Sequence, residues 1–179
     1  MITIGADPGE KGGIAVVDCL RTRVLEAFPM PVIEVTIGGK KRHRLDRTTL
    51  LDACKRIKET YQPLSHDSII AMVEKVGARP MEGAVGAFSF GGIYEGLCVA
   101  FLATGFRLEE ERPNVWKGKM KVPADKSAAV ARADAMFPDG RHMWRTPRGA
   151  KLDGPAEAAL IAKYCGDLWL PQLAGMVAA

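Results

Sequence analysis

The sequence predicts a single α/β domain, on three observations. Apolar runs of strand length stand at 2–7, 13–18 and 68–74, and segments with helical spacing of apolar residues follow them. The chain has 179 residues, of which 47% are hydrophobic, enough for one sizeable core and too few for two full domains. No internal repeat or linker-like stretch interrupts it, so we expect residues 1–179 to form one unit.

The first part of the chain predicts consecutive strands. ITIGAD (2–7) and GIAVVD (13–18) are joined by the Gly-rich turn PGEKGG, which is a hairpin pattern. RVLEAFP (23–29) is expected to form a third strand. Residues 30–45 end in the basic run KKRHR and are expected to form a loop or a loosely held hairpin arm.

The remainder predicts helices around two further strands. The run SIIAMVE (68–74) is continuously apolar and rich in β-branched residues, as is typical of a strand buried on both faces. The other expected elements are a helix at 46–60, a long Gly/Ala-rich helix at 84–104, a strand at 107–112, a turn or short helix at 113–122, a helix at 125–137, a polar basic loop at 138–152 and a final helix at 153–170.

The net charge, the cysteines and the distribution of apolar residues indicate which partners and which cellular compartment to expect. The net charge of +4 permits a polyanionic partner without requiring one. Cys19, Cys54, Cys98 and Cys165 form no CxxC or Cys/His cluster, so we expect reduced thiols and no zinc site. No leader pattern and no uninterrupted apolar stretch of about 18 residues is present, so we expect a cytoplasmic protein without a membrane partner.

Acidic residues stand where an α/β fold gathers functional groups. Asp7 ends the first strand, Glu74 ends the buried strand, and Asp153 and Glu157 share one face at the start of the last helix. Ligands of α/β sheets collect at strand ends, so we expect the two strand-terminal acids to face one crevice. The helix dipole also favours negative charge in the first turn of a helix.

A divalent cation would relieve the mutual repulsion of such carboxylates. Oxygen ligands select Mg²⁺ or Mn²⁺, and two ions about 3.5–4 Å apart activate a water and stabilise the leaving oxygen of a phosphodiester. Each acid alone has a structural alternative: Asp7 as a turn initiator, Glu74 as a strand-end charge beside Lys75, and Asp153 as a helix cap. Their joint placement favours a metal site.

Four blocks of the sequence resemble RuvC-type Holliday-junction resolvases. IGADPGEKGGIAVVD resembles the opening of that family, AMVEKV its second acidic segment, and LDGPAEAALIAKY its final helix. Between them, RPNVWKGKMKV and DKSAAVARADAMFP resemble a segment of the phage-encoded and organellar relatives. The blocks follow the family's order and cover most of residues 1–165.

The resemblance implies a ribonuclease H-like fold, with a mixed five-stranded sheet flanked by helices. It also implies a homodimeric, Mg²⁺- or Mn²⁺-dependent endonuclease that cuts branched DNA with two ions per site, in the bacterial host cytoplasm if the protein is phage-encoded. Asp7, Glu74, Asp153 and Glu157 would be the metal-binding acids. Lys126 would contact a phosphate or steady the transition state, with a solvated lysine as the alternative.

The resemblance is incomplete in two places. The final helix has Asp-x-x-x-Glu where bacterial members usually space two aspartates by three, which leaves open whether Glu157 binds metal directly or through water. RPMEGAVGAFSFGG replaces the bacterial pattern after the second acid, so cut-site preference does not carry over.

Basic residues are expected to surround the acidic centre and make DNA binding depend on salt. The candidates, each with a solvated loop position as its alternative, are Arg79, Lys117, Lys119, Lys121, Arg141, His142, Arg145, Arg148 and Lys151. Trp116 and Trp144 lie among these charges and are candidates for stacking on unpaired bases. For Trp116 a core position is favoured.

Small residues mark one face of the helix at 84–104. Ser89, Gly92 and Gly96 follow one another at three- and four-residue spacing, although each glycine costs a helix about 1 kcal/mol. Such a face favours close backbone approach. The neighbour is either the sheet of the same chain or, as the resemblance implies, the same helix of a second subunit.

Three other functions share parts of the pattern. ATPases of the actin and sugar-kinase superfamily also begin with Asp-x-Gly, but they need two such domains, and Gly9, Gly12 and Gly13 form neither a P-loop nor a dinucleotide fingerprint. The second alternative is a nuclease of the same fold with another substrate, such as an RNA–DNA hybrid, a flap or a transposon end. A non-catalytic binder of branched DNA is the third, and the presence of all four acids argues against it.

Overall fold

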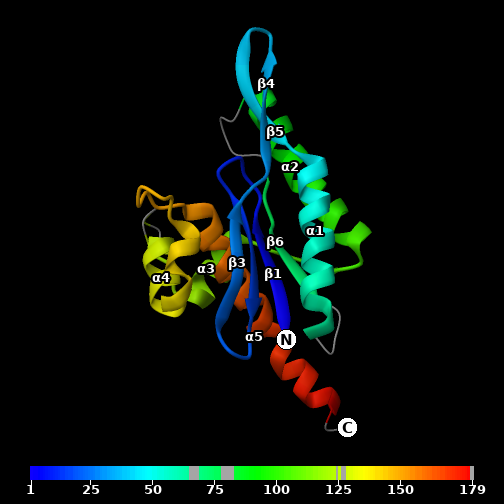
Figure 1. Ribbon diagram of the computed structural model, residues 1–179, viewed down its shortest axis with the longest axis vertical. Helices are drawn as coiled ribbons and strands as arrows, with labels where there is room; N and C mark the ends of the chain where they lie inside the picture. Colours follow the sequence, from blue (N-terminus) through cyan, green and yellow to red (C-terminus); the bar gives the residue numbers. More distant parts are fainter. Residues whose placement is uncertain (65–68, 78–82, 124, 126–127, 178–179) are drawn as a thin grey trace.

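The computed structural model describes residues 1–64, 69–77, 83–123, 125 and 128–177. A five-stranded sheet in the order β3-β2-β1-β6-β7 lies between helices on both of its faces (Figure 1). This confirms the expected mixed five-stranded sheet flanked by helices. The strands are β1 (Ile2–Asp7), β2 (Gly13–Asp18), β3 (Arg23–Pro29), β4 (Val32–Ile37), β5 (Lys40–Leu45), β6 (Ile70–Glu74) and β7 (Arg107–Glu111). The helices are α1 (Arg47–Tyr61), η1 (Gln62–Leu64), α2 (Ala84–Thr104), α3 (Pro113–Met120), α4 (Ala128–Met136), η2 (Pro138–Trp144) and α5 (Asp153–Val177).

Strand direction changes at the middle of the sheet. β2 runs antiparallel to both of its neighbours, β1 and β3, whereas β6 runs parallel to β1, and β7 runs parallel to β6. β1, β2 and β6 are buried along almost their whole length, which explains why they read as continuous apolar runs instead of alternating ones. Because β1 and β6 are parallel, their carboxyl ends meet at one edge of the sheet.

Two apolar layers hold the helices against the sheet. On one face, α1 and α2 pack on inward side chains of β1 and β2, with Leu50, Leu97 and Phe101 fully buried. On the other face, α3, α4 and α5 form the second layer, which includes Trp116 and Leu160. Burial of such side chains stabilises each layer by roughly 1.5–3 kcal/mol per large apolar residue.

Glycines let α5 approach the sheet at backbone distance. A Cβ on Gly5 would lie 2.1 Å from the carbonyl oxygen of Ala158, and one on Gly13 would lie 2.5 Å from the nitrogen of Pro155. Neither position therefore accommodates a larger residue without displacing α5. The hydroxyl of Thr3 donates to the α5 backbone at Ala162 over 2.7 Å. These contacts fix α5 along β1 with its N-terminus beside the β1–β2 turn.

Residues 30–45 form a hairpin arm, the second of the two expected alternatives. β4 and β5 pair only with each other among the described strands and project from one end of the molecule (Figure 1). Gly38 and Gly39 make the turn with φ of +57° and +74°. Two-residue hairpin turns of type I′ need this left-handed backbone, which glycine adopts at little cost.

Other boundaries differ from expectation in a few places. The segment 138–152 is not wholly a loop, because its first half forms η2 and buries Trp144 against Phe137. The last helix extends to Val177 in place of residue 170. α1 begins one residue later than expected, since the Asp46 carboxylate caps it by accepting from the Thr49 backbone nitrogen over 3.1 Å.

Two features of the structure relate to the expectation of a cytoplasmic protein: the state of the cysteines and the apolar helix α2. All four cysteines are buried free thiols, as predicted. α2 is long and apolar enough to cross a membrane by length and composition, and it is the one such helix among the described residues. The core helix of a soluble fold passes the same test, and one face of α2, with Ile93, Leu97 and Phe101, lies in the core beside the sheet.

Candidate active site

Asp7 and Glu74 end neighbouring parallel strands. Ala6 is the register partner of Val73, so the next residue on each strand is one of the two acids. Alternate residues of a strand share a face. Gly5 contacts α5, and Met72 belongs to the core on the α5 side. Both acids therefore face the layer formed by α3 and α5.

The N-terminus of α5 meets the same edge of the sheet. A parallel bridge joins Gly154 to Gly12 in the β1–β2 turn. Asp153 is exposed at the start of the helix, and Glu157, one turn later, is only 18% exposed. The backbone thus brings the strand ends carrying Asp7 and Glu74 and the helix start carrying Asp153 and Glu157 to one end of the sheet.

Two consecutive residues of α3 bond two of these acids. The indole Nε1 of Trp116 donates to Oε2 of Glu74 over 2.7 Å, and both groups are buried. Nζ of Lys117 donates to Glu157 Oε1 over 3.0 Å and to Oε2 over 3.2 Å. A buried carboxylate is strongly destabilised unless donors satisfy it. Trp116 and Lys117 therefore fix the carboxylates of Glu74 and Glu157 from one side.

The donor chemistry of these acids fits a hard cation. Their ligand atoms are all carboxylate oxygens, which Mg²⁺ and Mn²⁺ prefer. Among the described residues, no group of three His, Cys, Asp or Glu side chains is positioned to hold a metal ion. An ammonium group instead lies between the two oxygens of Glu157. Binding of a cation at Glu157 therefore requires Lys117 to move or to share that carboxylate.

A fifth acid lies beside the centre. Glu111 ends β7 directly opposite Glu74. Its carboxylate accepts from the hydroxyl of Tyr164 over 3.0 Å and from the backbone nitrogen of Arg112 over 2.8 Å. Burial, followed by this bond, raises the pKa of Tyr164 to about 12. Glu111 is not among the acids predicted from the sequence, although it ends a third parallel strand just as Glu74 ends the second.

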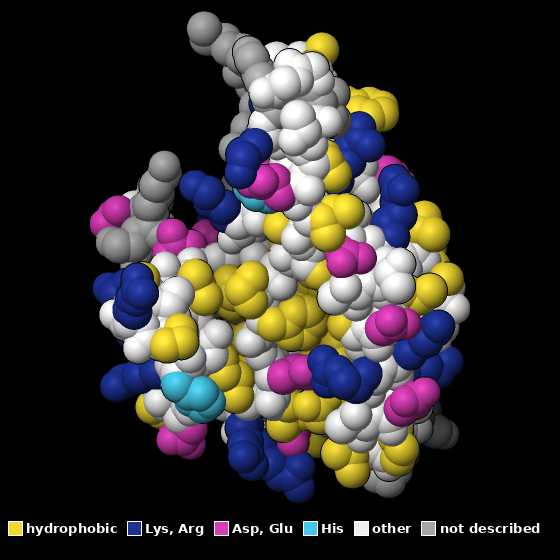
Figure 2. Space-filling model, turned by 45° about the horizontal axis from the view of Figure 1, so that its top comes forward, with side chains coloured by type: hydrophobic (Ala, Val, Ile, Leu, Met, Phe, Trp, Pro, Cys, Tyr) yellow, Lys and Arg dark blue, Asp and Glu magenta, His cyan; other side chains and the backbone are white. Residues whose placement is uncertain are grey.

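The predicted DNA-binding residues divide into exposed and engaged ones. Arg79, and the predicted catalytic residue Lys126, lie outside the described residues. The exposed cations are Lys119 of α3, Lys121 at its C-terminus, Arg141 and His142 of η2, and Arg148 and Lys151 of the loop before α5. Figure 2 shows acidic side chains between the basic ones over the face it presents, so no single-sign field covers that face.

Arg145 and Lys117 are held by carboxylates. The Arg145 guanidinium donates to both oxygens of Asp134, over 2.9 and 2.5 Å. This bond is the main reason that the pKa of Asp134 lies below its ordinary value. Contact of Arg145 or Lys117 with DNA stays a prediction, and both side chains would have to leave these partners to make it.

Neither tryptophan is exposed for base stacking. The side chain of Trp116 is buried, as the favoured alternative predicted, and that of Trp144 is equally buried. The indole Nε1 of Trp144 donates to Asp134 over 2.9 Å. The stacking role considered for Trp144 is therefore wrong, because η2 places this ring in the core.

The small-residue face of α2 packs within the chain at two of its three positions. Ser89 donates to the backbone oxygen of His43, and a Cβ on Gly96 would lie 2.3 Å from the Leu45 side chain. Both neighbours belong to β5. Gly92 is exposed, with no atom near its added Cβ.

An apolar, open face of α2 adjoins the small-residue face and shares Gly92 with it. The exposed fractions of its large apolar side chains are 59% for Val85, 81% for Phe88, 61% for Val99 and 57% for Leu102. These residues and Gly92 repeat at three-, four- and seven-residue spacing, so they form one stripe, which the exposed Glu95 interrupts.

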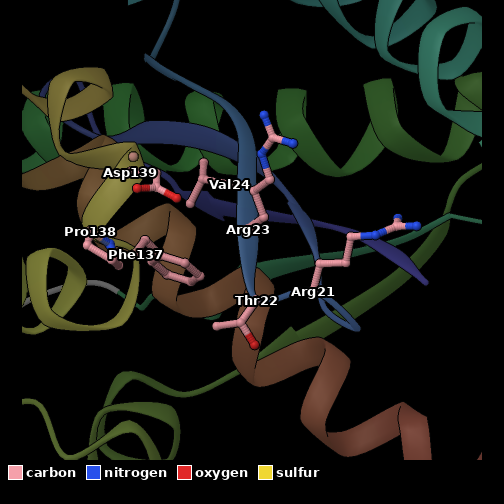
Figure 3. A pocket seen from close by; sticks show the side chains of 8 residues that line it. Arg21, Thr22, Arg23, Val24, Phe137, Pro138 and Asp139 are labelled. Atoms are coloured by element: carbon pink, nitrogen blue, oxygen red, sulfur yellow. The ribbon is translucent and has the colours of Figure 1, made fainter.

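A small cavity lies at the opposite end of the sheet from Asp7. It measures about 110 Å³ and is lined by the β2–β3 turn and the segment 137–140. Val24 and Phe137 give it an apolar wall, and the Arg21 side chain extends away from Phe137 (Figure 3). Asp139 is the one acid among the residues that line the cavity, so the cavity is not a second cluster of acids.

Comparisons with known proteins bear on the fold. No protein-family model matches the sequence, and no curated protein matches it. The structure of Thermus thermophilus RuvC in complex with a Holliday junction substrate is similar over 96% of this chain and 96% of that chain, with a TM-score of 0.61 and 14% identity. Another structure of Thermus thermophilus RuvC covers the same shares, with a TM-score of 0.53 and 17% identity. The similarity confirms the ribonuclease H-like fold, and at this identity it shows the fold alone.

Proposed function

We propose that this protein is a metal-dependent endonuclease that resolves four-way and other branched DNA as a homodimer. The observation that carries the proposal is the meeting of Asp7, Glu74 and the N-terminus of α5 at one edge of a ribonuclease H-like sheet. The RuvC structure that shares this fold is bound to a Holliday junction, which favours branched DNA as the substrate class.

The acids would hold two Mg²⁺ or Mn²⁺ ions, which when bound supply an activated water and neutralise the leaving oxygen. Asp7 and Glu74 stand on rigid, buried strands and would keep their oxygens in place as charge develops on the phosphate. The Trp116 indole restrains Glu74 from the protein side. Asp153 is exposed at the edge of the centre and would complete the ligand set with Glu157.

Lys117 has a separate part in this proposal. In the structure its ammonium group bonds both oxygens of Glu157, so it balances that carboxylate before a cation is bound. Once displaced, the same group would lie beside the centre and bind a phosphate oxygen of the substrate. One lysine would then serve both the unliganded and the DNA-bound state.

The apolar stripe of α2 supports the homodimer. Exposed apolar patches of this kind mark interaction surfaces, and Phe88 is its most exposed large side chain. A four-way junction presents two backbones that two symmetric centres would cut. We propose that two copies pair through the stripe, with Val85, Phe88, Gly92, Val99 and Leu102 in contact.

The substrate class is tested by comparing several DNA forms side by side. Wild-type protein is incubated with a four-way junction, a flap, an RNA–DNA hybrid and plain duplex in Mg²⁺ and in Mn²⁺, and the products are resolved on denaturing gels. We expect paired nicks in the junction and little cutting of duplex. Preferential cutting of the hybrid or the flap would contradict the proposal and indicate a nuclease of the same fold that acts on that substrate. Junction binding without cutting in either metal would indicate a non-catalytic binder.

A further inference from the structure

The β4–β5 hairpin is an arm with a fixed base. The backbone nitrogen of Met30 donates to the oxygen of Gly12 over 3.0 Å, and that of Asp46 donates to Pro31 over 2.9 Å. Leu45 is buried against α2. Strands of six residues each extend roughly 20 Å. The arm therefore leaves the molecule in a defined direction from the turn that follows Asp7.

The two faces of the hairpin carry charge in different ways. One face has Glu34, Lys41 and His43. There, Nζ of Lys41 pairs with Glu34 over 2.8 Å, and the ring of His43 lies 3.2 Å from Oε2 of Glu10 in the β1–β2 turn. These charges have partners within the chain, and one pair joins the arm to the turn beside the acidic centre.

The opposite face carries Arg42 and Arg44. In the register of the hairpin Arg42 is opposite Val35, and Arg44 is opposite Ile33, so these four side chains share one face. Both arginines are exposed, and neither forms an ion pair with any carboxylate in the part of the chain that the structure describes. Ile33, on the strand opposite Arg44, is 47% exposed. The face therefore offers two guanidinium groups beside small apolar side chains.

We infer that the β4–β5 hairpin is a DNA-binding arm, in which Arg42 and Arg44 bind backbone phosphates of the duplex that enters the centre past the β1–β2 turn. Guanidinium groups match phosphate oxygens in two-point contacts. A two-stranded ribbon also has the dimensions to lie along a groove of duplex DNA. The β-branched residues opposite the arginines, Ile33 and Val35, would contact the sugars. This inference rests on the proposed function, since it assumes a DNA substrate at the acidic edge.

The test measures the salt dependence of junction binding without divalent ions, so that no cutting occurs. Fluorescence anisotropy of a labelled four-way junction gives the dissociation constant at several salt concentrations from about 50 to about 200 mM. Phosphate contacts change affinity strongly over this range. The variant Arg42→Ala/Arg44→Ala is compared with Arg21→Ala/Arg23→Ala. The control removes the same number of charges from the β2–β3 turn and the first residue of β3, at the other end of the sheet.

We expect the arm variant to bind roughly tenfold more weakly and to lower the slope of log affinity against log salt by about 1.8, since each lost phosphate contact removes about 0.9. The control should match wild type. Arg42→Lys/Arg44→Lys keeps the charge and should retain most of the slope. Thermal unfolding by circular dichroism checks that all variants are folded.

Two outcomes would overturn the inference, and they are distinguishable. If wild type binds the junction and the arm variant has the same slope as the control, the arm does not bind DNA, and the proposed function stands. If wild type binds no DNA at all, both the DNA-binding role of the arm and the proposed function are wrong.

Discussion

The two faces of the central sheet are built differently. On the α5 face, backbone packs directly on backbone at Gly5 and Gly13, and buried groups such as Trp116 restrain the acids. On the α2 face, the helix keeps a wide apolar stripe exposed and supports the base of a projecting hairpin. The closed face suits chemistry, because ligands must be held in fixed positions. The open face suits the recognition of partners, because its side chains are accessible.

The largest expected effect comes from disturbing the closed face. Gly5→Ala places a Cβ 2.1 Å from the Ala158 oxygen, so α5 must move away from β1. We expect a loss of about 3 kcal/mol or more in the free energy of unfolding, measured by urea denaturation. Gly91→Ala in α2 meets no atom within 4 Å and should be neutral or stabilising by up to about 1 kcal/mol. Equal stability of the two variants would show that the close approach is not required.

The next effect tests the open face. Phe88→Asp puts a charge on the most exposed apolar side chain of the α2 stripe, so a dimer formed there should dissociate, with its dissociation constant raised by about a hundredfold or more. Sedimentation velocity at micromolar concentration measures this. Leu20→Asp changes another exposed side chain, 68% accessible, on the β2–β3 turn, and should leave the dimer intact. A wild-type protein that is monomeric and still cuts both strands symmetrically would contradict the dimer.

A smaller effect is expected from Trp116→Phe. The ring packing remains, but Glu74 loses its 2.7 Å donor. Supporting partners of metal ligands typically contribute 10- to 100-fold in affinity, so Mn²⁺ affinity, measured by titration calorimetry without DNA, should fall at least about tenfold. Trp144→Phe is a matched control, since it removes an equally buried indole donor, here to Asp134. If both variants bind Mn²⁺ with the same affinity, Trp116 does not support metal binding at Glu74.

Much of the fold was predictable because it depends on local pattern. β1, β2, β3 and α2 have the expected bounds, since continuous apolar runs and turn glycines mark them. η2 was not predicted because Met143 and Trp144 are the only large apolar residues of PDGRHMW, and the segment packs on β3, which is distant in sequence. Local pattern does not encode that contact.

The site was predictable in part for the same reason. Asp7 and Glu74 follow apolar strands, so their positions in the sequence mark the sheet edge. The partners of the acids were not predictable, because α3 reaches them only through tertiary packing. Lys117 bonds Glu157 in the structure, a contact that the sequence did not indicate, and its expected contact with DNA stays a prediction. The distinction between paired and unpaired charges in the basic hairpin likewise required the strand register.

The smallest effect concerns the closed face away from the site. Asp134 is bonded by Arg145, which lowers the pKa of its carboxyl below the ordinary 3.8. A lowered folded-state pKa stabilises the protein above about pH 4, and this contribution disappears as pH falls through the folded value. Asp134→Asn should therefore reduce the free energy of unfolding by about 1–2 kcal/mol at pH 7, with a smaller difference near pH 3.

Urea denaturation at the two pH values measures the effect of Asp134→Asn. Asp52→Asn is the control, since Asp52 is 69% exposed and lies 4.0 Å from Lys55; it should change stability little. A difference between wild type and Asp134→Asn that grows on acidification would contradict the assignment of the ion pair.

The central claim is that the acids at the end of the sheet form a catalytic metal site, and Asp7→Asn tests it most directly. The substitution keeps the size of the side chain and removes its charge. Nicking of a labelled four-way junction in Mg²⁺ is compared with junction binding by the same protein. We expect cutting to be abolished while binding stays equal to wild type or becomes tighter, because one negative charge is removed near the phosphates. Wild-type rates of cutting by Asp7→Asn would contradict the assignment of the catalytic site.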